Sequence, residues 1–303
     1  MPLITGRARE CASVVIDHEA CTGCGLCVKV CKGAPLAMVE GRVEVDQSIL
    51  FGCIGCGQCA VVCPEGCITV SGRDLDPSDI FDLPPRQERA DYPQLLKLLQ
   101  ARRSVRKFAD RDVDNELVEQ ILAAVCTAPM GLPPSDTEIL VLHGREKVQE
   151  FAADVVAVMA KTRWFFSRPM RVMLRPFWGK AGAEQTESFL APALEMFVRG
   201  REKGEDWLMY DAPLAMYFHT SAYADLYDPI VAATYAVLAA ESLGLGTCFI
   251  GTPAHFIKNN KKLNKKYAIP PGNQHGIAVI FGHPSVHYKR GVTRRLAGVT
   301  HRR

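Results

Sequence analysis

CTGCGLCVKVC, residues 21–31, places four cysteines at the spacing C-x2-C-x2-C-x3-C, and CIGCGQCAVVCP, residues 53–64, repeats that spacing. Ten of the twelve cysteines lie within the first 67 residues, and Cys126 and Cys248 are the two that follow. The first twenty residues lack the apolar segment of a secretory signal. We therefore expect a reducing cytoplasm, where cysteines bind metal more often than they form disulfides.

Disulfides, zinc and iron–sulfur clusters are the three alternatives for these cysteines. Zinc usually takes two separated pairs that close one tetrahedron, whereas three cysteines at two-residue gaps fit three corners of an iron–sulfur cube. Zinc knuckles or a disulfide scaffold remain the alternative. The spacing resembles that of bacterial two-cluster ferredoxins over about residues 12–72. The resemblance implies two [4Fe-4S] clusters, one held by Cys21, Cys24, Cys27 and Cys63, the other by Cys53, Cys56, Cys59 and Cys31.

Other residues of this region refine the comparison. Glycines stand between the cysteines and allow tight turns that direct amides toward sulfur: Gly23, Gly25, Gly55 and Gly57. Lys32 follows Cys31 where ferredoxins usually have proline, whereas Pro64 follows Cys63. Cys11 and Cys67 lie outside the repeat, and we expect both to be small buried hydrophobic residues.

Charge divides the chain at the same place. Residues 1–85 hold 6 Lys and Arg against 11 Asp and Glu, net −5, and the remaining residues hold 30 against 22, net +8. A proline-rich stretch, SGRDLDPSDIFDLPPRQ, separates the two parts and reads as a linker. We predict two domains, an acidic head (residues 1–85, with the linker) and a basic body (residues 86–303).

The body alternates helical and strand patterns. YPQLLKLLQARR carries a helical apolar stripe, VDNELVEQILAAVCTAP has Asp114 as a candidate N-cap, and PIVAATYAVLAAESLGLG reads as a central helix ended by Gly244. EILVLHG, PLAMYFH and HGIAVIFGH read as buried strands. The predicted fold class is α+β, with a sheet between helices.

Three patches of the body carry candidate chemistry. ARRSVRKF sets guanidinium groups beside a hydroxyl, as a phosphate site requires, although an arginine cluster can equally be a solvated helix end. ESLGLGTCFIG has glycines that let a flat ring approach the backbone, or that simply cap a helix before a strand. FGHPSVHYKRGVTRRLAG is a basic tail.

The order and spacing of these patches resemble those of the FMN-dependent nitroreductase family over about residues 92–298. The resemblance implies a nitroreductase-like α+β sandwich and a homodimer with FMN at the subunit interface. It assigns phosphate, ribityl and ring-edge contacts to Arg102, Arg103, Ser104 and Arg106, and backbone contacts near flavin N5 to Ile250, Gly251 and Thr252. It further assigns a returning phosphate contact to Arg294 or Arg295.

One motif departs from the family pattern. TAPMGLPPSDTEI retains Ala128 and Pro129, but the family's serine, asparagine and Pro-Trp are replaced by Met130, Pro133 and Asp136–Thr137. We therefore expect flavin contacts through the backbone of Pro129, Met130 and Gly131.

Two further segments have open interpretations. Residues 161–190 are aromatic and basic, and they fit dimer packing, a lid over the substrate or contact with a membrane surface, although Pro169 and Pro176 would break a continuous helix. The lysine run at residues 258–266 fits a solvated helix face or a dock for an acidic donor.

The predicted function is that of an FMN-dependent oxidoreductase. Electrons would pass from the two clusters to FMN and on to a small conjugated acceptor of the nitroaromatic, quinone or activated-alkene type. A low-potential donor such as ferredoxin, or NAD(P)H, would supply them. The alternatives are an NAD(P)H-driven flavin reductase and a non-enzymatic electron carrier or flavin-binding regulator. We expect no nucleic-acid partner and no membrane-spanning segment. We also expect no catalytic dyad, because the cofactor performs the chemistry; His219 and His283 are candidate proton donors, but both read more readily as structural histidines.

Overall fold

The computed structural model describes residues 12–31, 35–49, 52–73, 75–131, 136–258 and 260–302. Cys11, Lys32 and Pro133, considered above, lie outside these ranges.

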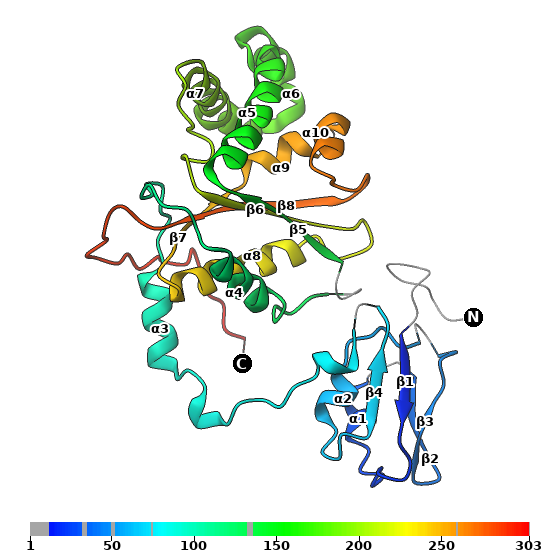
Figure 1. Ribbon diagram of the computed structural model, residues 1–303. Coiled ribbons are helices and arrows are strands. Elements are labelled where there is room, and N and C mark those ends of the chain that lie inside the picture. The colour runs from blue at the N-terminus through cyan, green and yellow to red at the C-terminus, as the bar shows by residue number, and fades with distance from the viewer. Residues whose placement is uncertain are drawn as a thin grey trace.

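The head follows the order strand, cysteine loop, helix, strand twice over (Figure 1). In each half the loop delivers two cysteines, the helix carries the third, and the fourth follows the helix. The first strand pairs with the last and the two middle strands pair with each other, both antiparallel. The elements are β1 (Ser13–Ile16), α1 (Leu26–Val30), β2 (Leu36–Val39), β3 (Arg42–Val45), α2 (Gln58–Val62) and β4 (Ile68–Ser71).

Glycine starts both helices of the head. Gly25 and Gly57 are the N-caps of α1 and α2, and both adopt the left-handed conformation, with φ of 71° and 72°. That region is open to glycine without steric penalty. The two halves therefore turn from loop to helix in the same way and present their cysteines equivalently.

Two short 3-10 turns, η1 (Pro77–Asp79) and η2 (Arg86–Glu88), interrupt an exposed stretch between head and body. The predicted boundary at residue 85 lies between these turns, and the division into two domains stays a prediction.

The body is built on a four-stranded antiparallel sheet in the order β5-β6-β8-β7. The predicted strands correspond to β5 (Thr137–His143), β6 (Leu214–Thr220) and β8 (Gln274–Gly282), and β7 (Gly246–Ile250) follows the glycines of the second patch. The predicted helices correspond to α3 (Tyr92–Ala101), α4 (Asn115–Val125) and α8 (Asp228–Ser242). Asp114 is the N-cap of α4, and Gly244 follows the end of α8 with a φ of 77°.

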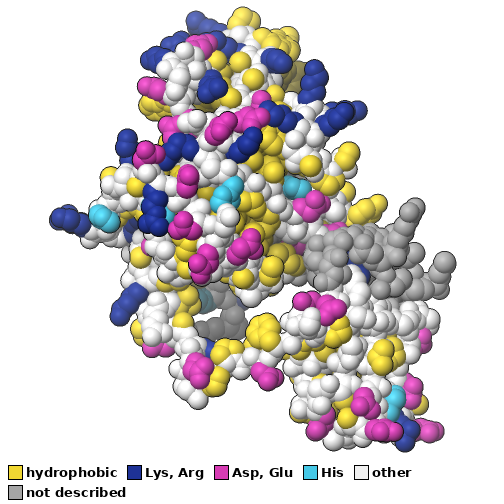
Figure 2. All heavy atoms as spheres, viewed as in Figure 1, with side chains coloured by type: hydrophobic (Ala, Val, Ile, Leu, Met, Phe, Trp, Pro, Cys, Tyr) yellow, Lys and Arg dark blue, Asp and Glu magenta, His cyan; other side chains and the backbone are white. Residues whose placement is uncertain are grey.

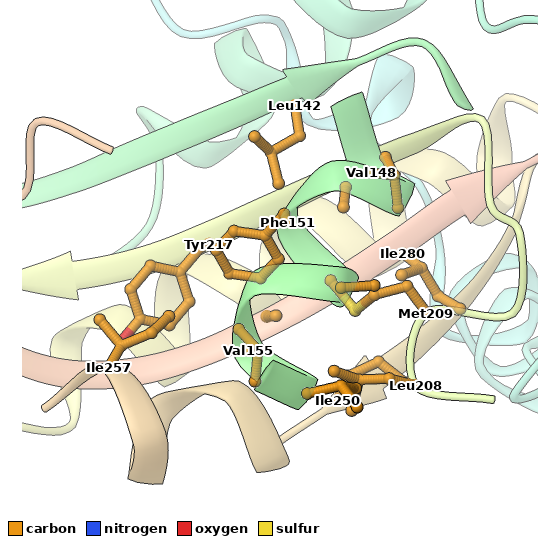
Figure 3. Packing of buried hydrophobic residues seen from close by; sticks show 14 of the residues in the cluster. Leu142, Val148, Phe151, Val155, Leu208, Met209, Tyr217, Ile250, Ile257 and Ile280 are labelled. Carbon is orange, nitrogen blue, oxygen red and sulfur yellow. The ribbon is translucent and has the colours of Figure 1, made fainter. Parts of the chain in front are cut away.

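Helices cover both faces of the sheet (Figure 1). One face packs against α4 and α8 through residues such as Ile121, Ala236 and Phe218. The other packs against α5 (Arg145–Thr162) and α9 (Thr252–Ile257), and α7 (Ala191–Glu202) packs on α5. In that second core Phe151 lies beside Tyr217, with ring centroids 6.3 Å apart (Figure 3). The predicted arrangement, a sheet between helices, is confirmed.

Residues 163–202 extend the second helical layer away from the sheet as η3 (Arg163–Phe166), α6 (Arg168–Gln185), the π-turn η4 (Thr186–Leu190) and α7. Pro169 begins α6, as a first-turn proline can. As predicted, this stretch is not one continuous helix, but α6 is interrupted at Gly179, where φ is 66°, and not at Pro176, where the backbone is helical. Apolar and basic side chains are exposed together on this extension (Figure 2). Within the described residues, no helix is both long enough and apolar enough to cross a bilayer.

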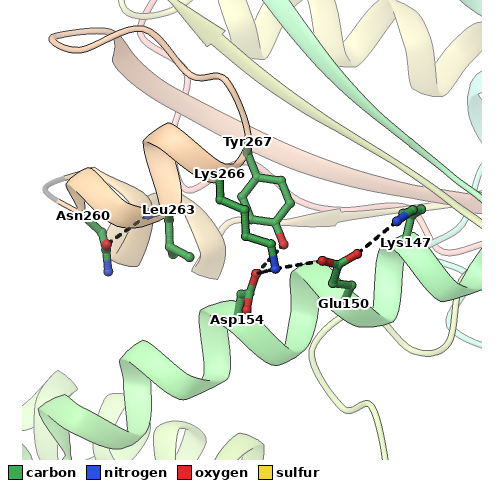
Figure 4. A network of polar contacts seen from close by, with 7 residues as sticks. All are labelled: Lys147, Glu150, Asp154, Asn260, Leu263, Lys266 and Tyr267. Carbon is green, nitrogen blue, oxygen red and sulfur yellow. Dashed lines mark hydrogen bonds and ion pairs between the residues drawn. The ribbon is translucent and has the colours of Figure 1, made fainter.

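A polar network ties α5 to α10 (Lys261–Lys266), which belongs to the lysine run (Figure 4). Asp154 accepts hydrogen bonds from Lys266 Nζ at 2.5 Å and from the Tyr267 hydroxyl at 2.6 Å. Lys266 also pairs with Glu150 at 2.8 Å, and Leu263 is buried. The run is therefore a helix attached to the body at its end, with its remaining lysines in solvent.

Replacing Tyr267 by Phe should lower the free energy of unfolding of the body by about 1.5–3 kcal/mol, because the partly buried Asp154 carboxylate loses the hydrogen bond from the Tyr267 hydroxyl. Urea unfolding followed by circular dichroism measures this change in the free energy of unfolding. The exposed Tyr223 provides the control: Tyr223→Phe should stay within about 0.5 kcal/mol of the parent. Equal effects of the two substitutions would contradict the role given to Asp154.

Candidate functional site

The cysteines of the head surround two separate hollows. The first is lined by Cys21, Cys24, Cys27, Cys63 and Cys67, and the second by Cys31, Cys53, Cys56 and Cys59. They hold ≈ 290 and ≈ 640 Å³ of empty space, open solvent included. The fourth cysteine of each repeat thus lies with the first three of the other repeat. This is the arrangement that the ferredoxin resemblance implied.

The chemistry of each hollow fits an iron–sulfur cube better than the alternatives. None of the eleven cysteines in the described residues forms a disulfide. Nor do the described Cys, His, Asp and Glu side chains include a group of three that could hold a single metal ion. A cube takes one cysteine on each of four separated irons, so its ligands stand farther apart than those of one zinc ion.

The thiols are held in an apolar setting. Burial raises the pKa of Cys59 to about 12, and the neighbouring Cys31 and Cys53 add to the shift. Burial also raises the pKa of Cys27, and Cys24 and Cys21 contribute in the same direction. Thiols ligate metal as thiolates, so cluster binding here must release protons, and the positive irons must offset this desolvation.

Cys63 differs from these. Burial opposes ionisation there too, but hydrogen bonds from the Cys67, Glu65 and Gly66 backbone and from the Cys67 thiol outweigh it and lower the pKa. Cys67 itself is 8% exposed and belongs to the core of the head, as expected of a small buried hydrophobic residue. Its sulfur is nevertheless 3.4 Å from that of Cys63, a contact that the sequence analysis missed.

In the body, residues 102–109 run across the neighbouring ends of β7 and β8. Ser104 forms a parallel bridge with Thr247, whose carbonyl accepts a hydrogen bond from Val105 N at 2.8 Å. Ala109 N donates to the His283 carbonyl at 2.8 Å. A Cβ on Gly246 would lie 2.7 Å from Val105, so the close approach of this segment to β7 requires glycine.

The arginines of this segment point to different neighbours. Arg102 and Arg103 face Glu241 near the end of α8; burial raises the pKa of Glu241, and the two arginines act against that shift. The Arg106 guanidinium lies over the Tyr210 ring, 5.7 Å from its centroid. Arg103 also donates to the Gln100 carbonyl at 3.2 Å.

The C-terminal tail returns to the same segment. A Cβ on Gly291 would lie 2.7 Å from Arg103 Nη2, so the tail passes directly against that guanidinium. Arg294 and Arg295 lie further along the tail, both exposed, and neither makes a hydrogen bond or ion pair within the described residues. The structure thus brings the start of the tail to the arginine segment and leaves these two side chains free of protein partners there.

The remaining predicted residues lie elsewhere on the sheet. Ile250 ends β7 and is buried, Gly251 is exposed, and Thr252 begins α9. Four residues of strand, about 13 Å, separate Gly251 from the Thr247–Ser104 bridge. The strand β7 therefore has residues 102–109, the arginine segment, beside its start and exposed backbone at its end.

The 129–131 loop lies at the opposite end of α8 from Arg102. Gly131 N donates to Asp228 Oδ1 at 2.9 Å, and Thr137 Oγ1 donates to the Met130 sulfur at 3.6 Å. Pro129 precedes them and is exposed. Asp228 and Glu241 are 13 residues apart on one helix, about 20 Å. A single chain does not bring this loop and the arginine segment together.

Two buried polar atoms beside the arginine segment have no hydrogen-bond partner within the described residues, namely Thr247 Oγ1 and His283 Nε2. Such groups are normally satisfied by water or a ligand. Together with the guanidinium groups they give this place the polar character that a phosphorylated cofactor needs. His219 is different, because it is 3% exposed, its Nδ1 is 3.0 Å from Asn273 Nδ2, and burial lowers its pKa. That environment suits a structural histidine.

Comparison with known families assigns both parts of the chain. Residues 99–283 match the model of the nitroreductase family, and residues 13–64 match that of the 4Fe-4S dicluster domain. The chain belongs to the nitroreductase family, and it is an oxidoreductase with an N-terminal iron–sulfur dicluster domain. The predicted α+β fold class with a small iron–sulfur domain is confirmed. A comparison with curated proteins finds no significant match.

Solved structures resemble the body. A nitroreductase with bound FMN from Bacteroides fragilis NCTC 9343 is 18% identical, with a TM-score of 0.51, covering 69% of this chain and 99% of that one. A nitroreductase with bound FMN from Desulfitobacterium hafniense DCB-2 is 22% identical, with a TM-score of 0.49 and coverage of 69% and 97%. An FMN-dependent nitroreductase from Clostridium difficile R20291 is 19% identical, with a TM-score of 0.45 and coverage of 68% and 99%. The likeness to the Bacteroides protein supports the fold.

Sequence reasoning missed the side chains that face the predicted site from distant segments. Tyr210 lies under Arg106, and Asp228 holds Gly131, across separations of about a hundred residues. Nothing local in the sequence marks such contacts.

Replacing Cys31 by Ser should remove the second cluster and leave the first, because Cys31 lines the second hollow although its sequence neighbours line the first. Protein purified without oxygen should fall from about eight irons per chain to about four. EPR of the reduced protein identifies the cluster that remains. Cys126→Ser, a substitution of an exposed cysteine of the body, should keep the full iron content. Loss of the first cluster in Cys31→Ser would refute the crossed assignment, in which the fourth cysteine of each repeat binds the cluster of the other repeat.

Proposed function

We propose that this protein is an FMN-dependent oxidoreductase that passes electrons from two [4Fe-4S] clusters to FMN and on to a small conjugated acceptor. The observation that carries the proposal is the presence, in one chain, of two hollows, each lined by at least four cysteines, and of the arginine segment (residues 102–109) paired with β7. Clusters of this kind exchange single electrons, and a flavin links such transfers to two-electron chemistry.

The residues of each hollow are its proposed ligands. Cys21, Cys24, Cys27 and Cys63 would hold the first cluster, and Cys53, Cys56, Cys59 and Cys31 the second. Amides near the sulfurs support this assignment, as when Gly55 N donates to the Cys53 sulfur at 3.5 Å. Such hydrogen bonds stabilise the charge on a ligand sulfur and tune its reduction potential.

The arginine segment is the proposed binding site for the phosphate of FMN and for the edge of its flavin ring. Arg102, Arg103 and Arg106 supply planar donors, and the Ser104 backbone is fixed by its bridge to β7. Arg294 or Arg295 would complete this binding site from the tail. Ile250, Gly251 and Thr252 would offer backbone groups at the far end of β7, where a Cβ on Gly251 would meet no atom within 4 Å. Pro129, Met130 and Gly131 would contribute backbone from their loop.

A homodimer belongs to the proposal. The 129–131 loop and the arginine segment lie at opposite ends of α8, so a second copy is the simplest way to bring both to one flavin. Apolar side chains exposed on α3 and the tail support an interface there: Tyr92, Leu95, Leu99, Leu296 and Val299.

Charge supports delivery of electrons from head to body. On the face in Figure 2 acidic side chains predominate on the head and basic ones are spread over the body. The proposed donor is a low-potential carrier such as ferredoxin, and the proposed location is the cytoplasm, where thiols stay reduced. A quinone, nitroaromatic or activated alkene would suit a site without a catalytic dyad.

Arg102→Ala or Arg106→Ala should weaken FMN binding about ten- to 150-fold, since each loses a charge-assisted contact of about 1.5–3 kcal/mol. Fluorescence titration of the apoprotein with FMN measures the affinity, and iron content shows that the head is intact. Arg111, exposed and paired with Asp114, is the matched control, and Arg111→Ala should bind FMN as the parent does. Unchanged affinity in both site variants would remove this segment from the flavin site.

The second test separates the proposal from its alternatives. Reduced ferredoxin should reduce the FMN of the full chain, and the Cys24→Ser/Cys56→Ser variant, altered in both hollows, should lose most of that rate while retaining FMN. Stopped-flow absorbance under anaerobic conditions measures both rates. Raising the salt concentration should slow the parent if head and body attract each other by charge.

The alternatives predict other results. Rapid reduction of both proteins by NAD(P)H alone would favour the flavin reductase. Reduction without turnover of any acceptor would favour a non-enzymatic carrier.

A further inference from the structure

The first hollow of the head contains one thiol more than a [4Fe-4S] cluster requires. Cys67 lines it together with Cys21, Cys24, Cys27 and Cys63, and its side chain is 8% exposed. The second hollow is lined by four cysteines. The excess is therefore specific to one site.

The position of Cys67 associates it most closely with the Cys63 corner of that site, with the Cys21 thiol as a second neighbour. Its sulfur is 3.4 Å from the Cys63 sulfur. Two sulfurs bound to one tetrahedral metal at about 2.3 Å each stand about 3.8 Å apart, whereas ligands on different irons of a cube are farther separated. At a separation of 3.4 Å, Cys63 and Cys67 are placed to bind the same iron and not two different irons. A complete cluster takes one thiolate at that iron, so only one of the two is a ligand at a time.

The two thiols reach this corner from separate elements. Cys63 follows the last turn of α2, whereas Cys67 directly precedes β4. The Cys67 carbonyl accepts a hydrogen bond from Asp17 N at 2.9 Å, and Ile68 pairs with Ile16 of β1. Loss of the Cys63 sulfur would therefore leave the backbone that carries Cys67 in place.

The pseudo-symmetry of the head provides an internal comparison. Cys67 follows Cys63 by four residues, and the residue four after Cys31 is Pro35, which lines the second hollow. The two halves thus share four ligand positions and differ at the fifth. Proline offers no ligand atom, so the second site lacks a substitute for Cys31.

We propose that Cys67 is a reserve ligand of the first cluster, able to bind the corner iron in place of Cys63. The proposal rests on the cluster assignment made above. The exchange moves no electrons: the Cys67 thiol gives its proton to solvent as its sulfur binds iron, and the Cys63 thiolate takes up a proton as it leaves.

The test compares four full-length variants purified without oxygen: Cys63→Ser, Cys67→Ser, Cys63→Ser/Cys67→Ser and Cys31→Ser. Cys63→Ser and Cys67→Ser should each retain about eight irons per chain, because one thiol remains at the corner. The double variant and Cys31→Ser should each fall to about four, because no sulfur remains at one corner. EPR of the reduced proteins should show a changed signal for the first cluster in Cys63→Ser alone.

The outcomes separate this proposal from the one it rests on. If Cys63→Ser falls to about four irons like the double variant, Cys67 is no ligand and the crossed assignment still stands. If Cys31→Ser keeps its full iron content, the cluster assignment itself fails.

Chelation provides a second measurement that does not depend on the folding of Cys63→Ser. A strong iron chelator should strip the first cluster of Cys67→Ser several-fold faster than that of the parent, since an opened corner is no longer recaptured. Equal stripping rates would overturn the proposal.

Discussion

The head depends on one constraint: the fourth cysteine of each repeat must lie in the hollow that is lined by the first three cysteines of the other repeat. Its described core is small and includes Cys27, Cys59 and Cys67, and a domain of this size buries little apolar surface. Because Cys31 reaches the second hollow and Cys63 the first, each site draws on both halves. Cluster binding by these cysteines would therefore join the halves, and its free energy would contribute to the stability of the head.

The body depends on a comparable junction around β7. Residues 102–109 pair with β7 and with the segment after β8, and Gly246 permits the close contact. The tail returns against Arg103. Three segments that are far apart in sequence thus meet at one end of a rigid sheet, which fixes the guanidinium groups without a dedicated binding loop. A site supported by strands is held more precisely than one on loops alone.

The features that could be predicted from sequence are those that depend on residues close together in the chain. The cysteine spacing, the caps at Asp114 and Gly244 and the strand patterns are local, and the structure agrees with them. Contacts such as Arg106 with Tyr210 depend on packing between distant segments and leave no local signal. Pro176 shows the opposite error: the backbone stays helical at the proline, and the break between the two helical parts of α6 falls at Gly179 instead. Cys67 was judged by its place outside the repeat, which does not reveal that its sulfur contacts that of Cys63, four residues earlier.

Because head and body are parts of one chain, a weak attraction between their opposite net charges is enough to bring them together. If the sixteen residues between Leu75 and Tyr92 behaved as a flexible chain, their root-mean-square span would be roughly 20–25 Å and the local concentration of one part around the other about millimolar. At such a concentration even a weak, salt-screened attraction between net −5 and net +8 would keep the two parts together for much of the time. The linker has prolines and short turns, which stiffen it and narrow the range of approach. Weak attraction would also let the head separate and meet an external donor, so a moderate charge difference suits the proposed transfer of electrons from a donor through the head to the body.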